Sequence, residues 1–332
     1  MKRWMGRGVL ALVVGLPALL FLSAQLSLDR GFEHAARTRA LPLLSPETVD
    51  GLVRVQARNV EFRTRVAGLG NEGPALLLLH GFPQTSILWE PLLEAAAAAG
   101  FRVAAFDQRG YSPGARPEGA EAYVISELRR DVIAVADALG FERFHLVGHD
   151  WGSIVTWATG PAHPDRVISL TSLSIPHPRV GLMGSNDPSR SPPLYVRLFQ
   201  VPGLAETLFT TGRLGLLRRM YGSTPPLHID EYASVFGEPG ALTAALNWYR
   251  AMPTSFADPT TFEAAVSMPT LWLWGKYDMQ IFHTPEIQAR MEEITTGPYR
   301  SVELDAAHWL MQEQTDVVVE AILEHVASHS GK

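Results

Sequence analysis

The sequence predicts an α/β fold, in which a mostly parallel sheet carries helices on both faces and a helical cap is inserted late in the chain. Short apolar runs alternate with helical stretches from about residue 75 onward, as in buried parallel strands joined by helices. The interval between His177 and about Met268 has no convincing strand pattern and is rich in proline, glycine and aromatic residues. The chain has 332 residues, of which 46% are hydrophobic and 19% charged. A globular core of this size is stable without disulfide bonds or structural metal ions.

The N-terminus has a different composition. Three basic residues precede an apolar run from Val9 to Leu22, which continues weakly to Leu28. A basic region followed by an apolar region is the pattern of an export signal, and extended to Leu28 it has about the ~20 residues that a bilayer span requires. Ala24 has Leu22 two places before it, so no clean cleavage site is present. We expect residues 1–28 to be an uncleaved signal anchor.

A cleaved signal peptide is the alternative for this segment, and a buried helix of the main fold is a third interpretation. The positive charges before the apolar run place the following domain outside the cytoplasm. The expected location is therefore exported and anchored in the membrane, or secreted or periplasmic if the signal is cleaved. Residues 29–50 are mixed in charge and contain two prolines, which predicts a spacer.

The folded part opens with two runs of alternating polarity, at 54–58 and 61–67, which predict an antiparallel pair. Five short apolar runs then predict buried strands: Ala75–Leu79, Arg102–Phe106, Phe144–Val147, Val167–Leu173 and Thr270–Trp274. Ser126–Leu139 has apolar residues at helical spacing. The predicted core comprises residues 51–178 and 267–330.

The predicted helical cap comprises residues 179–266. Glu231–Phe236 and Leu242–Arg250 are its clearest helical pieces. A long disordered loop is the alternative, but the many aromatic residues of this interval need a surface to pack against. The insertion therefore predicts a lid over the end of the sheet where a site forms.

Composition excludes several classes of function. The chain has no cysteine, which rules out disulfides, thiolate chemistry and cysteine-ligated metals. Basic residues do not cluster beyond the N-terminus, and the net charge is −6, so we expect no nucleic-acid partner. No His, Asp or Glu cluster has ligand spacing, so we expect no metal and no cofactor.

The stretch G-H-D-W-G at 148–152 follows a predicted strand and precedes a predicted helix. Two glycines flank Asp150 at minus two and plus two, as in a sharp turn that lifts a nucleophile above the sheet. The helix that begins at Trp151 points its unpaired N–H groups and positive dipole end at the same place. An aspartate in a glycine turn is common, so the interpretation depends on what else lies at this edge.

Three further groups are expected at the same edge. The strand before His80 and Gly81 ends there, and serine hydrolases with this spacing take oxyanion-hole N–H groups from the loop after it and from the residue after the nucleophile. Here these donors are Phe82 and Trp151. Asp278 follows the strand at 270–274, and His308 comes one helix and one strand later. Asp278 then orients the imidazole of His308 as a general base.

The aspartate itself predicts the reaction. A carboxylate is a poor match for acyl transfer, but it displaces a leaving group at saturated carbon and forms an alkyl ester. Water activated by His308 then attacks the ester carbonyl. Asp150 therefore indicates an epoxide or an alkyl halide as the substrate.

From about Val53 to Val326 the sequence resembles the α/β-hydrolase family, and within it the epoxide hydrolases that have an aspartate nucleophile. The resemblance depends on eight motifs: H-G-F-P (80–83), D-Q-R-G-Y-S (107–112), G-H-D-W-G (148–152), S-I-P-H-P (174–178), F-Q-V-P-G (199–203), N-W-Y-R (247–250), W-G-K-Y-D (274–278) and A-H-W (307–309). The order nucleophile, acid, histidine is the family's chain order.

The resemblance implies that two cap tyrosines donate hydrogen bonds to the epoxide oxygen. Tyr249 lies in N-W-Y-R, and Tyr195 lies five residues before the Gln of F-Q-V-P-G. A phenol stays protonated near neutral pH and can protonate the departing alkoxide. Aromatic packing in a helical cap is the alternative for both. Phe82, Trp151, Tyr195 and Tyr249 are expected to surround a small apolar epoxide.

Two other functions remain open. Haloalkane dehalogenases share the Asp, acid and His set, and Trp151 fits their halide site, but Phe82 stands where they commonly carry Asn. Fluoroacetate dehalogenases follow the nucleophile with arginine, which Trp151 replaces. A non-catalytic ligand-binding member of the fold would not need all three catalytic groups.

The chain also departs from the family at Ala307, which stands in place of glycine, and at Ser112-Pro113, where an extra glycine is usual.

Overall fold

The computed structural model describes residues 31–181, 193–222, 224–262, 265–279 and 284–330. The predicted signal anchor, residues 1–28, lies outside this part of the chain. Within the described ranges, no helix is long and apolar enough to cross a membrane.

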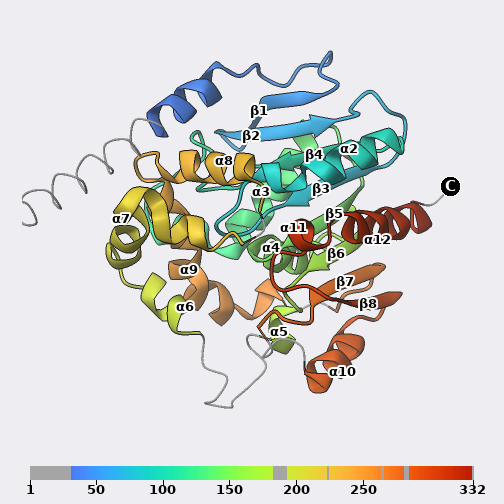
Figure 1. Ribbon diagram of the computed structural model, residues 1–332. Coiled ribbons are helices and arrows are strands. Elements are labelled where there is room, and N and C mark those ends of the chain that lie inside the picture. The colour runs from blue at the N-terminus through green and yellow to red at the C-terminus, as the bar shows by residue number, and fades with distance from the viewer. Residues whose placement is uncertain (1–30, 182–192, 223, 263–264, 280–283, 331–332) are drawn as a thin grey trace, which may run out of the picture.

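Eight strands form one sheet (Figure 1) in the order β1-β2-β4-β3-β5-β6-β7-β8. The strands are β1 (Gly51–Ala57), β2 (Val60–Ala67), β3 (Ala75–Leu79), β4 (Arg102–Phe106), β5 (Phe144–His149), β6 (Val167–Leu173), β7 (Thr270–Gly275) and β8 (Tyr299–Leu304). β2 pairs antiparallel with both β1 and β4, and the remaining pairs are parallel. The predicted α/β fold and its mostly parallel sheet are confirmed.

Helices connect the strands and form the cap. They are α2 (Glu90–Ala98), α3 (Ile125–Ala138), α4 (Trp151–Thr159), α5 (Pro178–Gly181), α6 (Leu194–Phe199), α7 (Leu204–Arg219), α8 (Pro226–Phe236), α9 (Ala241–Ala257), α10 (Pro285–Ile294), α11 (Leu310–Glu313) and α12 (Thr315–Ser328). The inserted helices α6 to α9 lie between β6 and β7 in the chain and gather on one side of the molecule in Figure 1.

The central strands are buried on both faces, as their uninterrupted apolar sequence requires. In β3, Leu77 and Leu79 join one hydrophobic cluster with α3, α4 and the cap. Leu76 and Leu78 join a second cluster with α2 and α12. Because successive side chains of a strand point to opposite faces, a parallel strand covered by helices on both faces must be apolar at every position.

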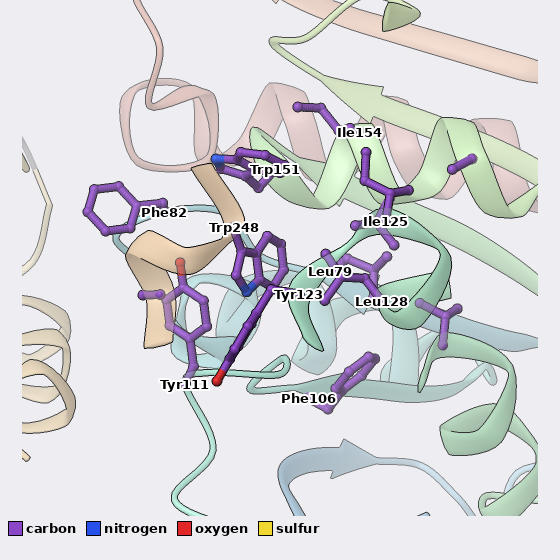
Figure 2. Packing of buried hydrophobic residues seen from close by; sticks show 14 of the residues in the cluster. Leu79, Phe82, Phe106, Tyr111, Tyr123, Ile125, Leu128, Trp151, Ile154 and Trp248 are labelled. Atoms are coloured by element: carbon purple, nitrogen blue, oxygen red, sulfur yellow. The ribbon is translucent and has the colours of Figure 1, made fainter. Parts of the chain in front are cut away.

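The first cluster continues from the core into the cap through aromatic residues (Figure 2). Trp248 of α9 packs edge-on against Trp151 at 5.5 Å and against Tyr111 at 5.8 Å between ring centroids. The Trp248 indole N–H also donates to the Arg109 carbonyl at 2.8 Å. The large aromatic residues that predicted a packed cap therefore fix α9 on the sheet.

A buried ionic network also holds the cap on the core. Glu231 of α8 accepts hydrogen bonds from Arg63 at 2.9 Å, from Arg65 at 2.5 Å and from the Thr85 hydroxyl at 2.7 Å. Arg63 donates in addition to Asp107 at 2.8 Å. Burial alone would raise the pKa of Glu231, but the two guanidinium groups outweigh it and lower that pKa. Each charged group of this network has a partner of opposite charge, because a buried charge without a partner would be strongly destabilising.

Residues 31–40, which fall in the segment predicted as a spacer, are helical. Their buried positions are Gly31, His34, Ala35 and Thr38, the spacing of one helix face. His34 Nδ1 lies 2.5 Å from the carboxylate of Glu238, between α8 and α9, and Arg116 pairs with the same carboxylate. The start of the described chain is thus packed on the cap rather than extended as a linker.

Candidate active site

The turn between β5 and α4 holds Asp150 in a conformation that few residues adopt. Its φ is 52° and its ψ is −118°, and its side chain is lifted toward the cap. A Cβ at Gly148 would lie 2.3 Å from the Gly152 carbonyl oxygen, and one at Gly152 would lie 2.1 Å from the Leu79 oxygen. Only glycine fits at either position, so the two glycines of the motif are explained by close backbone contacts.

The backbone N–H of Phe82 donates a hydrogen bond to Asp150 Oδ1 at 2.8 Å. The loop after β3 approaches so closely that a Cβ at Gly81 would lie 2.3 Å from the same oxygen. No hydrogen bond from the Trp151 N–H to Asp150 is present among the described residues. One of the two expected donors therefore already contacts the carboxylate, while the other lies at the start of α4, where an N–H has no partner within its own helix.

The loops after β7 and β8 bring Asp278 and His308 to the same place. His308 Nδ1 lies 3.0 Å from Asp278 Oδ2, and its Nε2 lies 3.6 Å from Asp150 Oδ2. The second Asp278 oxygen accepts from the Met279 N–H at 2.7 Å. Asp150, Asp278 and His308 thus form one connected set with the imidazole between two carboxylates.

The electrostatic setting of His308 depends on both neighbours. Burial lowers the pKa of His308, but the charge of Asp278 and the hydrogen bonds to Asp150 and Asp278 outweigh burial and raise it to about 10. The imidazole is therefore protonated while both carboxylates are charged.

Two groups that the sequence analysis missed hold the His308 backbone. His149 Nε2 lies 2.9 Å from the His308 carbonyl oxygen, and the Ser174 hydroxyl donates to the same oxygen at 3.0 Å. Burial, with the nearby His308, lowers the pKa of His149 to about 4, so His149 is neutral and donates from Nε2. Its position directly before Asp150 was the only signal in the sequence.

Glu313 is a third missed residue. Its carboxylate accepts from the Ala307 N–H at 2.7 Å and from the Trp309 N–H at 3.2 Å. These two amides flank His308 in the chain. Glu313 therefore holds the loop by hydrogen bonds on both sides of His308. No local sequence pattern predicts this role.

A cavity of about 430 Å³ lies between these groups and the cap. The core contributes Phe82, Asp150, Asp278, Met279, His308 and Trp309. The cap contributes Tyr195, Leu198, Phe199, Ala205, Leu208, Phe209, Leu216, Met220 and Tyr249. Most of the lining is apolar, with a small number of polar groups among it, which is how small-molecule sites are built.

Tyr249 and Tyr195, the two tyrosines named from the sequence, both line this cavity. Their ring centroids are 6.4 Å apart, and Tyr249 is also 5.4 Å from the Phe82 ring. Tyr249 is buried, whereas Tyr195 is 39% exposed. Desolvation, which is greater for Tyr249, and the charge of Asp150 raise the pKa of each above that of an ordinary phenol. Both hydroxyls therefore stay protonated and able to donate.

Trp151 differs from the sequence expectation in one respect. Its ring is not part of the cavity wall, because it is buried between Trp248 at 5.5 Å and Tyr249 at 5.1 Å. Phe82 by contrast lines the cavity and contacts the rings of Phe199, Phe209, Phe236 and Tyr249. Trp151 thus packs against Tyr249, which lines the cavity.

Residues in positions 74–210 match the family described as the alpha/beta hydrolase fold. The chain is 33% identical to epoxide hydrolase A of Mycobacterium tuberculosis, over 79% of this chain and 93% of that protein. It is 29% identical to human epoxide hydrolase 4, over 86% of this chain and 82% of the relative.

Solved structures give the same picture. The crystal structure of epoxide hydrolase A from Mycobacterium thermoresistibile is 29% identical with a TM-score of 0.73, and the match covers 84% of this chain and 98% of that one. An epoxide hydrolase from Vigna radiata is 25% identical with a TM-score of 0.72 and the same two coverages.

The close contacts of the turn generate a first prediction. Gly152→Ala should lower the free energy of unfolding by about 1–3 kcal/mol and should displace Asp150, because the new methyl group meets backbone rather than a flexible side chain. The measurement is denaturant unfolding together with turnover. Gly215→Ala in α7 is the control, since a Cβ there meets nothing within 4 Å. Equal behaviour of the two variants would contradict the packing argument.

Proposed function

The chain belongs to the epoxide hydrolases of the α/β-hydrolase fold, and on that premise we propose that it opens a small apolar epoxide to a vicinal diol through an ester on Asp150. The observation that carries the proposal is the placement of Asp150. One of its oxygens is held by the Phe82 N–H at 2.8 Å, and the other faces His308 at 3.6 Å, under two tyrosines in an apolar cavity.

In the first step, Asp150 Oδ2 attacks a ring carbon of the epoxide. Oδ1 is occupied by the Phe82 N–H, so Oδ2 is the oxygen left to react. The C–O bond of the strained ring breaks as the new C–O bond forms, and the departing oxygen takes a proton from Tyr249 or Tyr195. The raised pKa of each tyrosine keeps that proton available in the free enzyme.

In the second step, His308 passes its proton to the tyrosinate left by ring opening and becomes neutral. It then takes a proton from the water that adds to the carbonyl carbon of the ester. Oδ1 becomes the oxyanion, next to the Phe82 N–H that already contacts it and the Trp151 N–H. Collapse of this intermediate breaks the bond between the ester carbonyl carbon and Oδ2. Oδ2 leaves in the diol and takes the proton of the added hydroxyl, and the regenerated Asp150 carboxylate keeps the oxygen of water. The tyrosine and His308 are then back in their starting protonation states, so the net change is one water added to one epoxide.

Ester formation also prepares the base. The pKa of about 10 for His308 depends in part on hydrogen bonding to Asp150 and on the Asp150 charge. An ester has no charge, so its formation removes that contribution and lowers the pKa of His308. In the free enzyme the imidazole is paired with two carboxylates. After the ester has formed, the imidazole can become neutral, which is the state that a base requires.

An ester-trapping experiment tests the two-step route. His308→Gln should form the ester and fail to hydrolyse it, so the intact mass should rise by that of the epoxide. Asp150→Asn is the matched control and should gain no mass. An Asp150→Asn variant that becomes alkylated, or a His308→Gln variant with full steady-state activity, would contradict the assignment. Single turnover of the parent in ¹⁸O-water should give an unlabelled diol.

The tyrosines separate an epoxide from a halide substrate. Replacing Tyr249 or Tyr195 with Phe keeps the ring and removes only the hydroxyl, and loss of one donor should raise the barrier to epoxide opening by about 2–4 kcal/mol. Hydrolysis of a preformed ester should change little. The measurement is the rate of Asp150 alkylation in rapid-quench experiments. A double Phe variant that opens epoxides at the parental rate but releases halide from haloalkanes would favour a dehalogenase.

We propose an extracytoplasmic location, because a basic segment precedes the apolar run in residues 1–28. A fusion of residues 1–50 to a reporter that is active only after export should be active and should sediment with membranes. Replacing Leu16 and Leu19 with Arg in the fusion is the control and should abolish both. An active reporter that stays in the soluble extracellular fraction would instead indicate cleavage of the signal.

A further inference from the structure

The cap carries large apolar side chains that are exposed to solvent. We define the cap apolar face as seven exposed residues of α6, α7 and the turn between them: Leu194, Leu198, Val201, Leu204, Leu208, Leu216 and Met220. Leu194 alone is 70% exposed. Single exposed apolar residues are ordinary, but a continuous group on two successive helices indicates an interaction surface.

This face is continuous with the wall of the active-site cavity. Leu198, Leu208, Leu216 and Met220 belong to both the exposed set and the cavity lining. An apolar molecule that rests on the outside of α6 and α7 is therefore already in contact with side chains that surround Asp150. Such a molecule can pass from the exposed face into the cavity while it stays in contact with apolar side chains.

The charge of the same segment is opposite to that of the whole chain. Residues 194–220 contain four arginines and one acidic residue, Glu206, in a chain whose net charge is −6. Arg250 donates to Glu206 at 2.8 Å, and Arg197 and Arg219 are exposed beside the apolar residues. Apolar side chains bordered by arginine are typical of helices that lie in the interface of an anionic bilayer.

The described chain starts next to the cap. A Cβ at Gly31 would lie 2.2 Å from the Gly237 backbone, so the described chain starts against the end of α8, and α8 packs on α7. Eight residues separate the apolar run Val9–Leu22 from Gly31. Eight residues span at most about 30 Å, which ties the apolar run to the neighbourhood of the cap.

We propose that the cap apolar face docks on the surface of a bilayer that contains anionic lipids, and that the cavity takes its epoxide from that bilayer. The second half rests on the proposed function and narrows it to lipophilic epoxides that partition into membranes. The occupant is a lipid surface, because the face combines exposed apolar side chains with exposed arginines. The physical drive is burial of the exposed leucines together with attraction of arginine to lipid phosphate.

The docking is tested on the full chain, which has no cysteine and therefore accepts one label at a chosen place. Leu194→Cys and, as control, Val317→Cys on α12 each receive an environment-sensitive fluorophore. In phosphatidylcholine–phosphatidylglycerol vesicles with nitroxide-labelled lipid, the probe at position 194 should be quenched at least about threefold more than the one at 317. Equal quenching would overturn the proposal. So would a probe at 194 that is shielded without lipid in a particle of twice the mass, which would place a second copy there.

The substrate route is tested with Leu194→Ser, Val201→Ser and Leu204→Ser combined, since none of these residues lines the cavity. Turnover of a short water-soluble epoxide should be unchanged. For a long-chain epoxide presented in the same vesicles, kcat/KM should fall about tenfold, through KM, and less so without phosphatidylglycerol. Equal effects on both substrates, or on neither, would overturn the route. If the parent hydrolyses neither epoxide while the probe at 194 is still quenched, the proposed function fails and the docking stands.

Discussion

The arrangement of the site depends on one close contact between backbones. Gly152 lies against the end of β3 and Gly148 lies against Gly152, so tightly that neither glycine has room for a methyl group. This contact forces Asp150 into a positive φ and directs its carboxylate at the Phe82 N–H. Since β3, β5, β7 and β8 are parallel, the loops that follow them end at the same edge. The turn brings the nucleophile to the point where those loops meet.

Phe82 connects the core chemistry to the cap. Its N–H contacts Asp150, while its ring contacts aromatic residues of α6, α7, α8 and α9. The cap cannot move as a separate lid without disturbing these contacts and the buried pairs of Glu231 with Arg63 and Arg65. The tyrosines on α6 and α9 are therefore held at a defined place in the wall of the cavity that Asp150 also lines.

Much of this was predictable because the relevant signals are local. Apolar runs of four to seven residues predict the buried strands, and the glycines around Asp150 require a tight turn whatever surrounds it. Other parts were not predictable for physical reasons. The helical residues 31–40 bury His34 and Thr38, so no apolar periodicity marks them. Glu313 and His149 act through the His308 backbone, and contacts of that kind arise only once distant loops are brought together.

The double role of Phe82 has a consequence for how substrate range can diverge among relatives. A side chain whose backbone holds the nucleophile and whose ring supports the cap is difficult to replace without losing activity. The leucines and methionine of α7 that line the cavity make no such contact with Asp150, and they reach the surface. Natural variation and laboratory selection should therefore accumulate along α7, which can widen or narrow the cavity while the reacting groups stay in place.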